Sequence, residues 1–129
     1  MTMSREKLLK TIQEIANTKQ PNLSLFNSDL TELPCEIALL THLESLDLSD
    51  NSLRSLPNEI GLLTNLKHLN LDYNDLEKLP SSLTKLIELK ELDFYLQEYN
   101  QDLIADSLIK NEIGFFVKDA HQRPRMFFI

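Results

Sequence analysis

The sequence repeats itself at an interval of 23 residues. The stretch LESLDLSDNSLRSLPNEIGL at 43–62 aligns without a gap with LKHLNLDYNDLEKLPSSLTK at 66–85, and partial copies begin at residues 20 and 89. Repetition with a period of about 20 to 50 residues is typical of solenoids, in which each repeat is a small unit that stacks on its neighbours. This pattern constrains the fold more than any other feature of the chain.

Within each copy the leucines alternate with polar residues. In LESLDL, Leu46 and Leu48 point to one side of an extended segment, while Ser45 and Asp47 point to the other. Burying one Leu is worth about 1.5–3 kcal/mol, but a single repeat cannot bury its own apolar side. Stacked neighbours can, so the repeats predict a ladder of short parallel strands over a leucine core.

Two further residue types recur at fixed positions. Asn51 and Asn74 follow the strands, where a carboxamide can satisfy backbone groups that a turn leaves unpaired, and they are expected to form a structural ladder. Pro34, Pro57 and Pro80 each follow a Leu. Proline holds the preceding residue extended and can open a helical turn, so each Pro is expected to start the returning segment of its repeat.

The complete motif L-x-x-L-x-L-x-x-N-x-L stands at 43–53 and at 66–76, and each copy is followed by L-P-x-x-I/L. In these residues, over roughly 20–101, the chain resembles the leucine-rich repeat family. The L-P motif is similar to the short 23-residue intracellular class, which includes Ras-binding scaffolds, the Ras suppressor and many bacterial repeat proteins. The resemblance implies an α/β repeat solenoid, coiled right-handed with its β ladder on the concave face, and a role in binding other proteins.

The N-terminal residues 1–19 predict a capping helix. Leu8, Ile12, Ile15 and Ala16 fall on one helical face, and Ser4 could cap the start. A solenoid needs such a unit because its open end would otherwise expose the core. The alternative is a helix that binds a partner or a membrane surface.

Residues 102–129 are expected to form an irregular C-terminal cap or a tail. The segment 102–110 has helical spacing, and the aromatic-rich stretches GFFV and MFFI could pair as a hairpin that closes the last repeat. Exposed aromatic side chains would be a liability in water, which favours a cap. The alternatives are a docking tail and an oligomer interface.

Composition excludes several classes of protein. The 129 residues have a net charge of -7, which argues against a nucleic-acid binder. The single cysteine, Cys35, excludes an internal disulfide. No apolar run approaches the roughly 20 residues that a membrane span needs, and the N-terminus lacks a signal-peptide core. We expect a cytoplasmic protein, or an effector exported without a cleavable signal.

The outward side chains of the ladder form the candidate binding surface. Equivalent positions of neighbouring strands lie about 4.8 Å apart, so they line up as columns. The columns are acidic with aromatic residues at their corners, a composition common in binding hot spots, and we expect a partner that offers Arg or Lys. The candidate partner-binding residues are Phe26, Asp47, His68, Asn70, Asp72, Tyr73, Glu91, Asp93 and Tyr95.

The size of this surface limits the partner. Four strands make a ladder only about 15 Å across, whereas a standard interface buries about 800 Å² on each side. The partner is therefore expected to be a short peptide or a weak contact, unless an edge, a cap or a second copy adds area. The protein itself is expected to be a monomer or a weak homo-oligomer, and a merely solvated sheet face is the alternative.

No pattern indicates an enzyme. His68 beside Glu91 is the one arrangement that suggests metal or acid–base chemistry, but a convincing metal site needs several converging ligands. Gly61 and Gly114 are too isolated for a phosphate-binding loop. We expect no catalytic residue, no metal and no cofactor. The alternative functions are a recognition fragment of a larger signalling or ubiquitin-ligase-type effector, and a structural protein that self-associates through its C-terminal aromatic residues.

Overall fold

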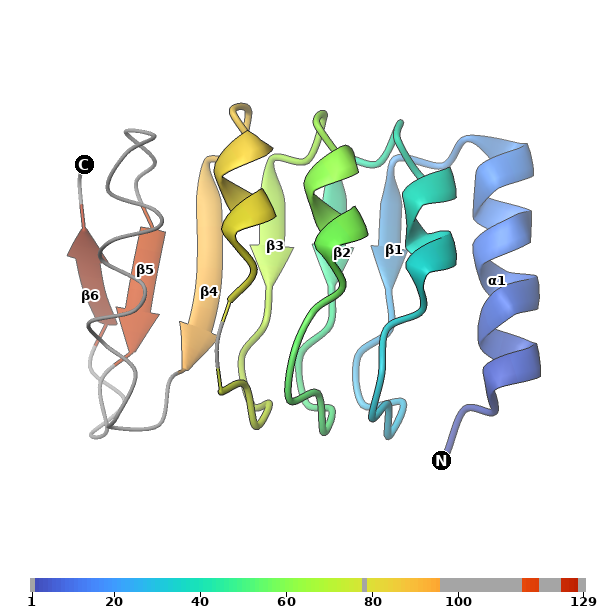
Figure 1. The fold of residues 1–129 in the computed structure, drawn as a ribbon, viewed down its shortest axis with the longest axis horizontal. Helices are drawn as coiled ribbons and strands as arrows, with labels where there is room; N and C mark the ends of the chain where they lie inside the picture. The colour runs from blue at the N-terminus through green and yellow to red at the C-terminus, as the bar shows by residue number, and fades with distance from the viewer. Residues whose placement is uncertain (1, 78, 96–114, 119–123, 128–129) are drawn as a thin grey trace.

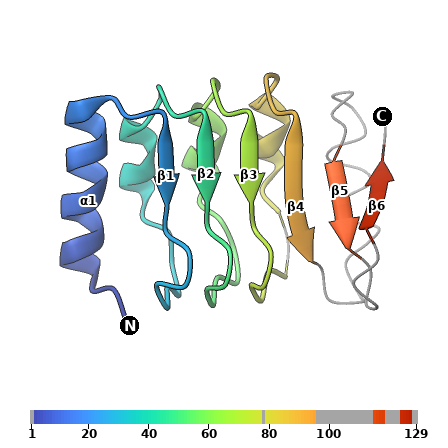
Figure 2. The same cartoon turned by 180° about the vertical axis from the view of Figure 1, so that it is seen from behind.

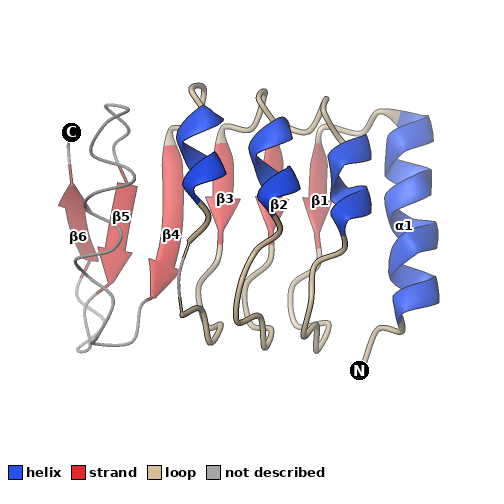
Figure 3. Ribbon diagram, in the orientation of Figure 1, coloured by secondary structure: helices blue, strands red, loops and turns tan. Residues whose placement is uncertain are grey.

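The computed structural model describes residues 2–77, 79–95, 115–118 and 124–127. Strands lie side by side in one sheet, with helix α1 at the N-terminal end of the row (Figure 1). Short 3-10 helices cover one face of the sheet, while the other face carries no helix among the described residues (Figures 2 and 3). The elements are α1 (Arg5–Thr18), β1 (Asn22–Ser24), η1 (Cys35–Leu39), β2 (Ser45–Asp47), η2 (Asn58–Leu62), β3 (His68–Asn70), η3 (Ser81–Lys85), β4 (Glu91–Tyr95), β5 (Phe115–Lys118) and β6 (Pro124–Phe127).

The first four strands pair in parallel with a register of one repeat. Leu23 pairs with Leu46, Leu46 with Leu69, and Leu69 with Leu92. This is the alignment that the 23-residue period predicts. Each strand is only three to five residues long, so no strand is stable alone and the stack as a whole holds the register.

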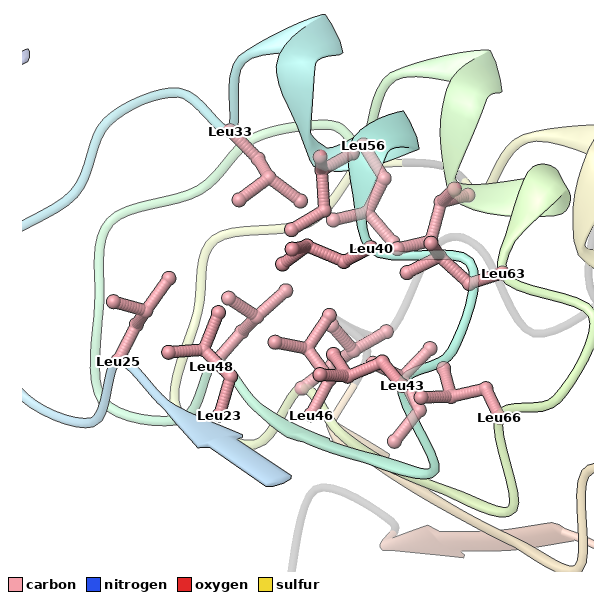
Figure 4. Packing of buried hydrophobic residues seen from close by; sticks show 14 of the residues in the cluster. Leu23, Leu25, Leu33, Leu40, Leu43, Leu46, Leu48, Leu56, Leu63 and Leu66 are labelled. Atoms are coloured by element: carbon pink, nitrogen blue, oxygen red, sulfur yellow. The ribbon is translucent and has the colours of Figure 1, made fainter. Parts of the chain in front are cut away.

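The repeated leucines form one continuous core. Their side chains point into the space between the strands and the 3-10 helices (Figure 4). Leu43, Leu48, Leu53 and Leu66 have no exposed surface. The core runs from α1 to Leu92 without a break, so a change in one internal repeat affects its neighbours on both sides.

The three repeated Leu-Pro pairs open the returning segments. Pro34, Pro57 and Pro80 have extended ψ values of 155°, 151° and 144°, and each directly precedes a 3-10 helix. Gly61 in η2 lies close to η3, because a Cβ atom built on it would meet the carbonyl oxygen of Ser82 at 2.6 Å. Neighbouring returns are thus in direct contact at this position.

Asn51 and Asn74 connect consecutive coils through buried hydrogen bonds. The Oδ1 atom of Asn51 accepts from the backbone N–H of Leu30 at 2.9 Å, and its Nδ2 donates to the carbonyl of Leu25 at 2.9 Å. Asn74 repeats the arrangement one coil later, with Leu53 as donor at 3.0 Å and Leu48 as acceptor at 2.9 Å. These amides satisfy backbone groups that would otherwise be buried without partners.

Helix α1 packs on the first coil. Ser4 is its N-cap and accepts from the N–H of Lys7 at 3.2 Å, and the helix buries Leu8, Ile12 and Ile15 in the core. Among the described residues, no helix is long and apolar enough to span a membrane.

The C-terminal end of the sheet is formed by two further strands, whereas an irregular segment was expected there. Strand β5 pairs in parallel with β4 and antiparallel with β6, with Phe116 opposite Met126. The two aromatic-rich stretches therefore pair as a hairpin and continue the sheet. The predicted helix at 102–110 lies outside the described residues, and the capping role of 102–129 stays a prediction.

Candidate functional site

The helix-free side of the ladder presents two columns of polar side chains. Register places Asn22, Ser45, His68 and Glu91 in the first column, and Ser24, Asp47, Asn70 and Asp93 in the second. We call this surface the strand face. It also includes the exposed residues that follow the strands, which are Phe26, Asn27, Asp50 and Tyr73.

Side chains of the second column are held by the backbone that follows them. Oδ1 of Asp47 accepts from the N–H of Ser49 at 2.9 Å and from its hydroxyl at 2.5 Å. Oδ1 of Asn70 accepts from the N–H of Asp72 at 3.0 Å. Asp and Asn commonly bond their own backbone two residues on, which fixes their orientation. Asp47 and Asn70 are therefore oriented before any partner arrives.

His68 and Glu91 face each other across strands β3 and β4. Nδ1 of His68 lies 3.2 Å from Oε2 of Glu91, and both side chains are about half exposed. The contact places Glu91 next to a group that becomes cationic on protonation. This contact joins the side chains of β3 and β4 on the strand face.

Asp72 is not at the surface, which corrects the expectation for this residue. Only 6% of it is exposed, and its neighbour in the previous coil, Ser49, is equally buried. The reason is that β3 ends at Asn70, so the in-out alternation stops there and the turn draws the next residues inward. Tyr95, the expected residue one coil later, lies in β4, and its side chain lies outside the described residues.

Among the described residues, two aromatic side chains are exposed on the turn edge, where the strands end. Phe26 is 55% exposed and Tyr73 is 59% exposed. Tyr73 has a φ of 55°, in the left-handed region, and the same position holds Asp50 with φ 56° and Asn27 with φ 51° in the preceding coils. Asp50 was not among the expected site residues, although an Asp directly before the ladder Asn is a usable signal for this backbone conformation.

The opposite edge, where the strands begin, has a different charge pattern. Nζ of Lys67 lies 2.8 Å from Oε1 of Glu44 in the previous coil. This hydrogen bond and the lysine charge lower the pKa of Glu44, and the same contact raises the pKa of Lys67. Exposed Lys90 follows one coil later. The starting edge therefore carries paired charges of both signs, whereas the turn edge presents exposed carboxylate and aromatic groups.

Other reactive side chains lie apart from the strand face. Cys35 is exposed at the start of η1, and the charge of Glu36 raises the pKa of its thiol, which disfavours the nucleophilic thiolate. His42 contacts the carbonyl of Gln20 through Nε2 at 3.0 Å. In the part of the chain that the structure describes, no three His, Cys, Asp or Glu side chains are placed to hold a metal ion.

Comparison with known proteins agrees with this architecture. A family model described as a leucine-rich repeat region matches residues 5–110. A solved leucine-rich repeat protein of Leptospira interrogans is 34% identical with a TM-score of 0.69. The leucine-rich repeat domain of the type III effector XopL is 25% identical with a TM-score of 0.62.

These similar structures are longer than this chain. The match to the Leptospira protein covers 79% of this chain and 27% of that one. The match to the XopL domain covers 78% of this chain and 38% of that one. Comparison with curated proteins gives no significant match.

Proposed function

The chain belongs to the leucine-rich repeat family, and on that premise we propose that it is a non-catalytic protein-interaction module. Its strand face binds a peptide or protein that offers basic side chains. Members of this family generally bind other proteins, which supports the general function. The basic nature of the partner rests on this chain's own residues.

The observation that carries the proposal is the fixed carboxylate of Asp47. Its Oδ1 atom is committed to Ser49, so its orientation is set while the charge still faces outward. Asp93 occupies the same column two coils later. Side chains that are already ordered lose less conformational freedom when a partner binds, which increases affinity for a small surface.

The experiment reverses two charges on this column. Bait protein with Asp47→Lys and Asp93→Lys should fail to retain a protein that wild-type bait captures from cell extract at low salt. The matched control, Glu14→Lys with Glu59→Lys, makes the same change of net charge on α1 and η2. Circular dichroism melts confirm that all three baits are folded. Capture of the same protein by the Asp47→Lys, Asp93→Lys variant would contradict the proposal.

A second candidate is that this chain acts as the recognition part of a larger effector. It is supported by the similarity to the leucine-rich repeat domain of a type III effector and by the small share of that chain that it covers. An open reading frame that joins this sequence to an additional domain would favour it. We also propose, as the sequence suggests, a cytoplasmic location, membership of the short Ras-suppressor-like class and self-association through the C-terminal aromatic residues.

A further inference from the structure

We propose that the turn edge of the strand face holds an arginine side chain, with its guanidinium stacked on the ring of Tyr73 and paired with the carboxylate of Asp50. The inference rests on the proposed function and narrows its partner from any basic segment to one that carries arginine. Neither residue has a role in the leucine core.

The backbone at Tyr73 is the first reason. In the two preceding coils the same left-handed position is filled by Asn27 and Asp50, residue types whose short polar side chains tolerate positive φ. A bulky aromatic residue at φ 55° is strained by comparison. Strain of this kind is retained where the side chain does something that the common residue cannot.

Exposure of the ring is the second reason. With 59% of Tyr73 exposed, packing does not explain an aromatic residue at this position. Phe26 is also an exposed aromatic residue on the turn edge, but it has no positive φ. Tyr73 therefore combines a disfavoured backbone with an available π face, and such a face attracts cations.

Asp50 supplies the charge. Its backbone N–H donates to the carbonyl of Asp72 at 2.9 Å, which places it in the coil directly before Tyr73. Its side chain is exposed, and it forms no ion pair with any residue that the structure describes. At the opposite edge the carboxylate of Glu44 already has a cationic partner in Lys67, so it is less available to an incoming cation. Charge complementarity thus directs an incoming cation to the turn edge.

Arginine fits this pair better than lysine. Coils stand about 4.8 Å apart, so one planar group can lie on the ring and reach the neighbouring carboxylate. A guanidinium stacks on aromatic faces and forms two-pronged hydrogen bonds with carboxylates. An ammonium group is more strongly hydrated and acts only as a point charge.

The test titrates three hexapeptides into the 15N-labelled protein and follows amide shifts by NMR. The peptides alternate glycine with arginine, with lysine or with uncharged citrulline. The arginine peptide should bind with a dissociation constant about 2 to 5 times lower than that of the lysine peptide. Shifts should centre on residues 50 and 73, and the citrulline peptide should bind more weakly than either.

Variants separate the ring from the charge. Tyr73→Leu should abolish the preference for arginine over lysine, whereas Tyr73→Phe should keep it. Asp50→Asn should weaken both cationic peptides. Glu59→Gln, an equal loss of charge on η2, should change neither.

Three results would overturn the inference: equal affinity of the wild-type protein for arginine and lysine peptides, an unchanged preference in Tyr73→Leu, or no binding of the arginine peptide. The proposed function is judged separately by charge reversal at Asp47 and Asp93. Charge reversal could abolish partner capture while Tyr73→Leu leaves the preference for arginine over lysine intact. That result would support the acidic binding face and contradict only the arginine site.

Discussion

Ser49 binds Asp47 twice, because its backbone N–H and its hydroxyl both donate to the same carboxylate oxygen, at 2.9 Å and 2.5 Å. One oxygen of Asp47 is therefore fixed by the residue two positions later, just after the end of β2. Ser49 is buried while Asp47 is partly exposed. The pair connects the interior of the solenoid to the strand face, so a change at the buried serine should alter the orientation of the Asp47 carboxylate.

Ser49→Ala keeps the backbone hydrogen bond and removes the hydroxyl. We expect a loss of about 0.5–1.5 kcal/mol in the free energy of unfolding, measured by urea denaturation, and weaker binding of a basic peptide. Ser55→Ala, which removes an exposed hydroxyl, is the control and should leave both quantities unchanged. Unaltered peptide binding in Ser49→Ala would show that the orientation of Asp47 is not needed.

The buried amide of Asn74 should be far more important than an exposed one. Asn74→Ala leaves the N–H of Leu53 and the carbonyl of Leu48 without their partner, and each buried unsatisfied group costs about 1–3 kcal/mol. We expect a loss of at least about 2 kcal/mol in urea denaturation. Asn65 also bonds a neighbouring coil, through Nδ2 and the carbonyl of Thr41 at 2.8 Å, but it is exposed. Water can replace it, so an equal loss in Asn65→Ala would contradict this explanation.

Gly61 should be intolerant of the smallest side chain. In a helical segment Ala is usually better than Gly by roughly 1 kcal/mol. Here a Cβ would lie 2.6 Å from the carbonyl oxygen of Ser82, so the two returns would have to separate. We expect Gly61→Ala to destabilise the protein by about 1–3 kcal/mol. Ala38 holds the equivalent position in η1, and Ala38→Gly is the companion variant that should cost only the helical preference. A more stable Gly61→Ala protein would show that the returns are not in close contact.

The contact between Glu44 and Lys67 should make a pH-dependent contribution to stability. The pKa of Glu44 is lowered in the folded protein, so its contribution is present at neutral pH and is lost as the pH falls through that lowered value. The pKa of Lys67 is raised, so its contribution is lost only as the pH rises through its own folded value. A double-mutant cycle with Glu44→Gln and Lys67→Met, measured by urea denaturation, should give a coupling energy at neutral pH that disappears in acid. High salt should reduce it, because both side chains are exposed. A coupling that persists in acid would exclude the ion pair as its source.

The repeat period predicted the ladder because periodic burial leaves a direct trace in the sequence. Leu46 and Leu69 must face the core in every coil, so their spacing sets the register. Proline likewise marks the returns, since its fixed φ has the same consequence wherever it stands. Features with such a strict link between residue type and conformation can be read without a structure.

The strand face was harder to predict because its limits depend on where each strand ends. Alternation would place Asp72 outward, but the short strand ends two residues earlier and the turn buries it. Asp50 was not selected as a site residue for the same reason, since the feature that it shares with Tyr73 is a left-handed backbone conformation. Local turn geometry, and not the repeat period, decides which side chains this edge presents.

Tyr73→Asn should make the protein more stable and a poorer binder. Asn relieves the strain of a bulky residue at positive φ, which costs about 1–2 kcal/mol, and restores the residue type found at position 27. We expect the melting temperature to rise by a few degrees, while the preference for arginine over lysine peptides is lost. Phe26→Asn is the matched control, because it removes an equally exposed aromatic ring from a position without positive φ. It should bring no gain in stability. If Tyr73→Asn lowers the melting temperature, then the tyrosine is held there by packing, and its exposed ring no longer requires a binding partner to explain it.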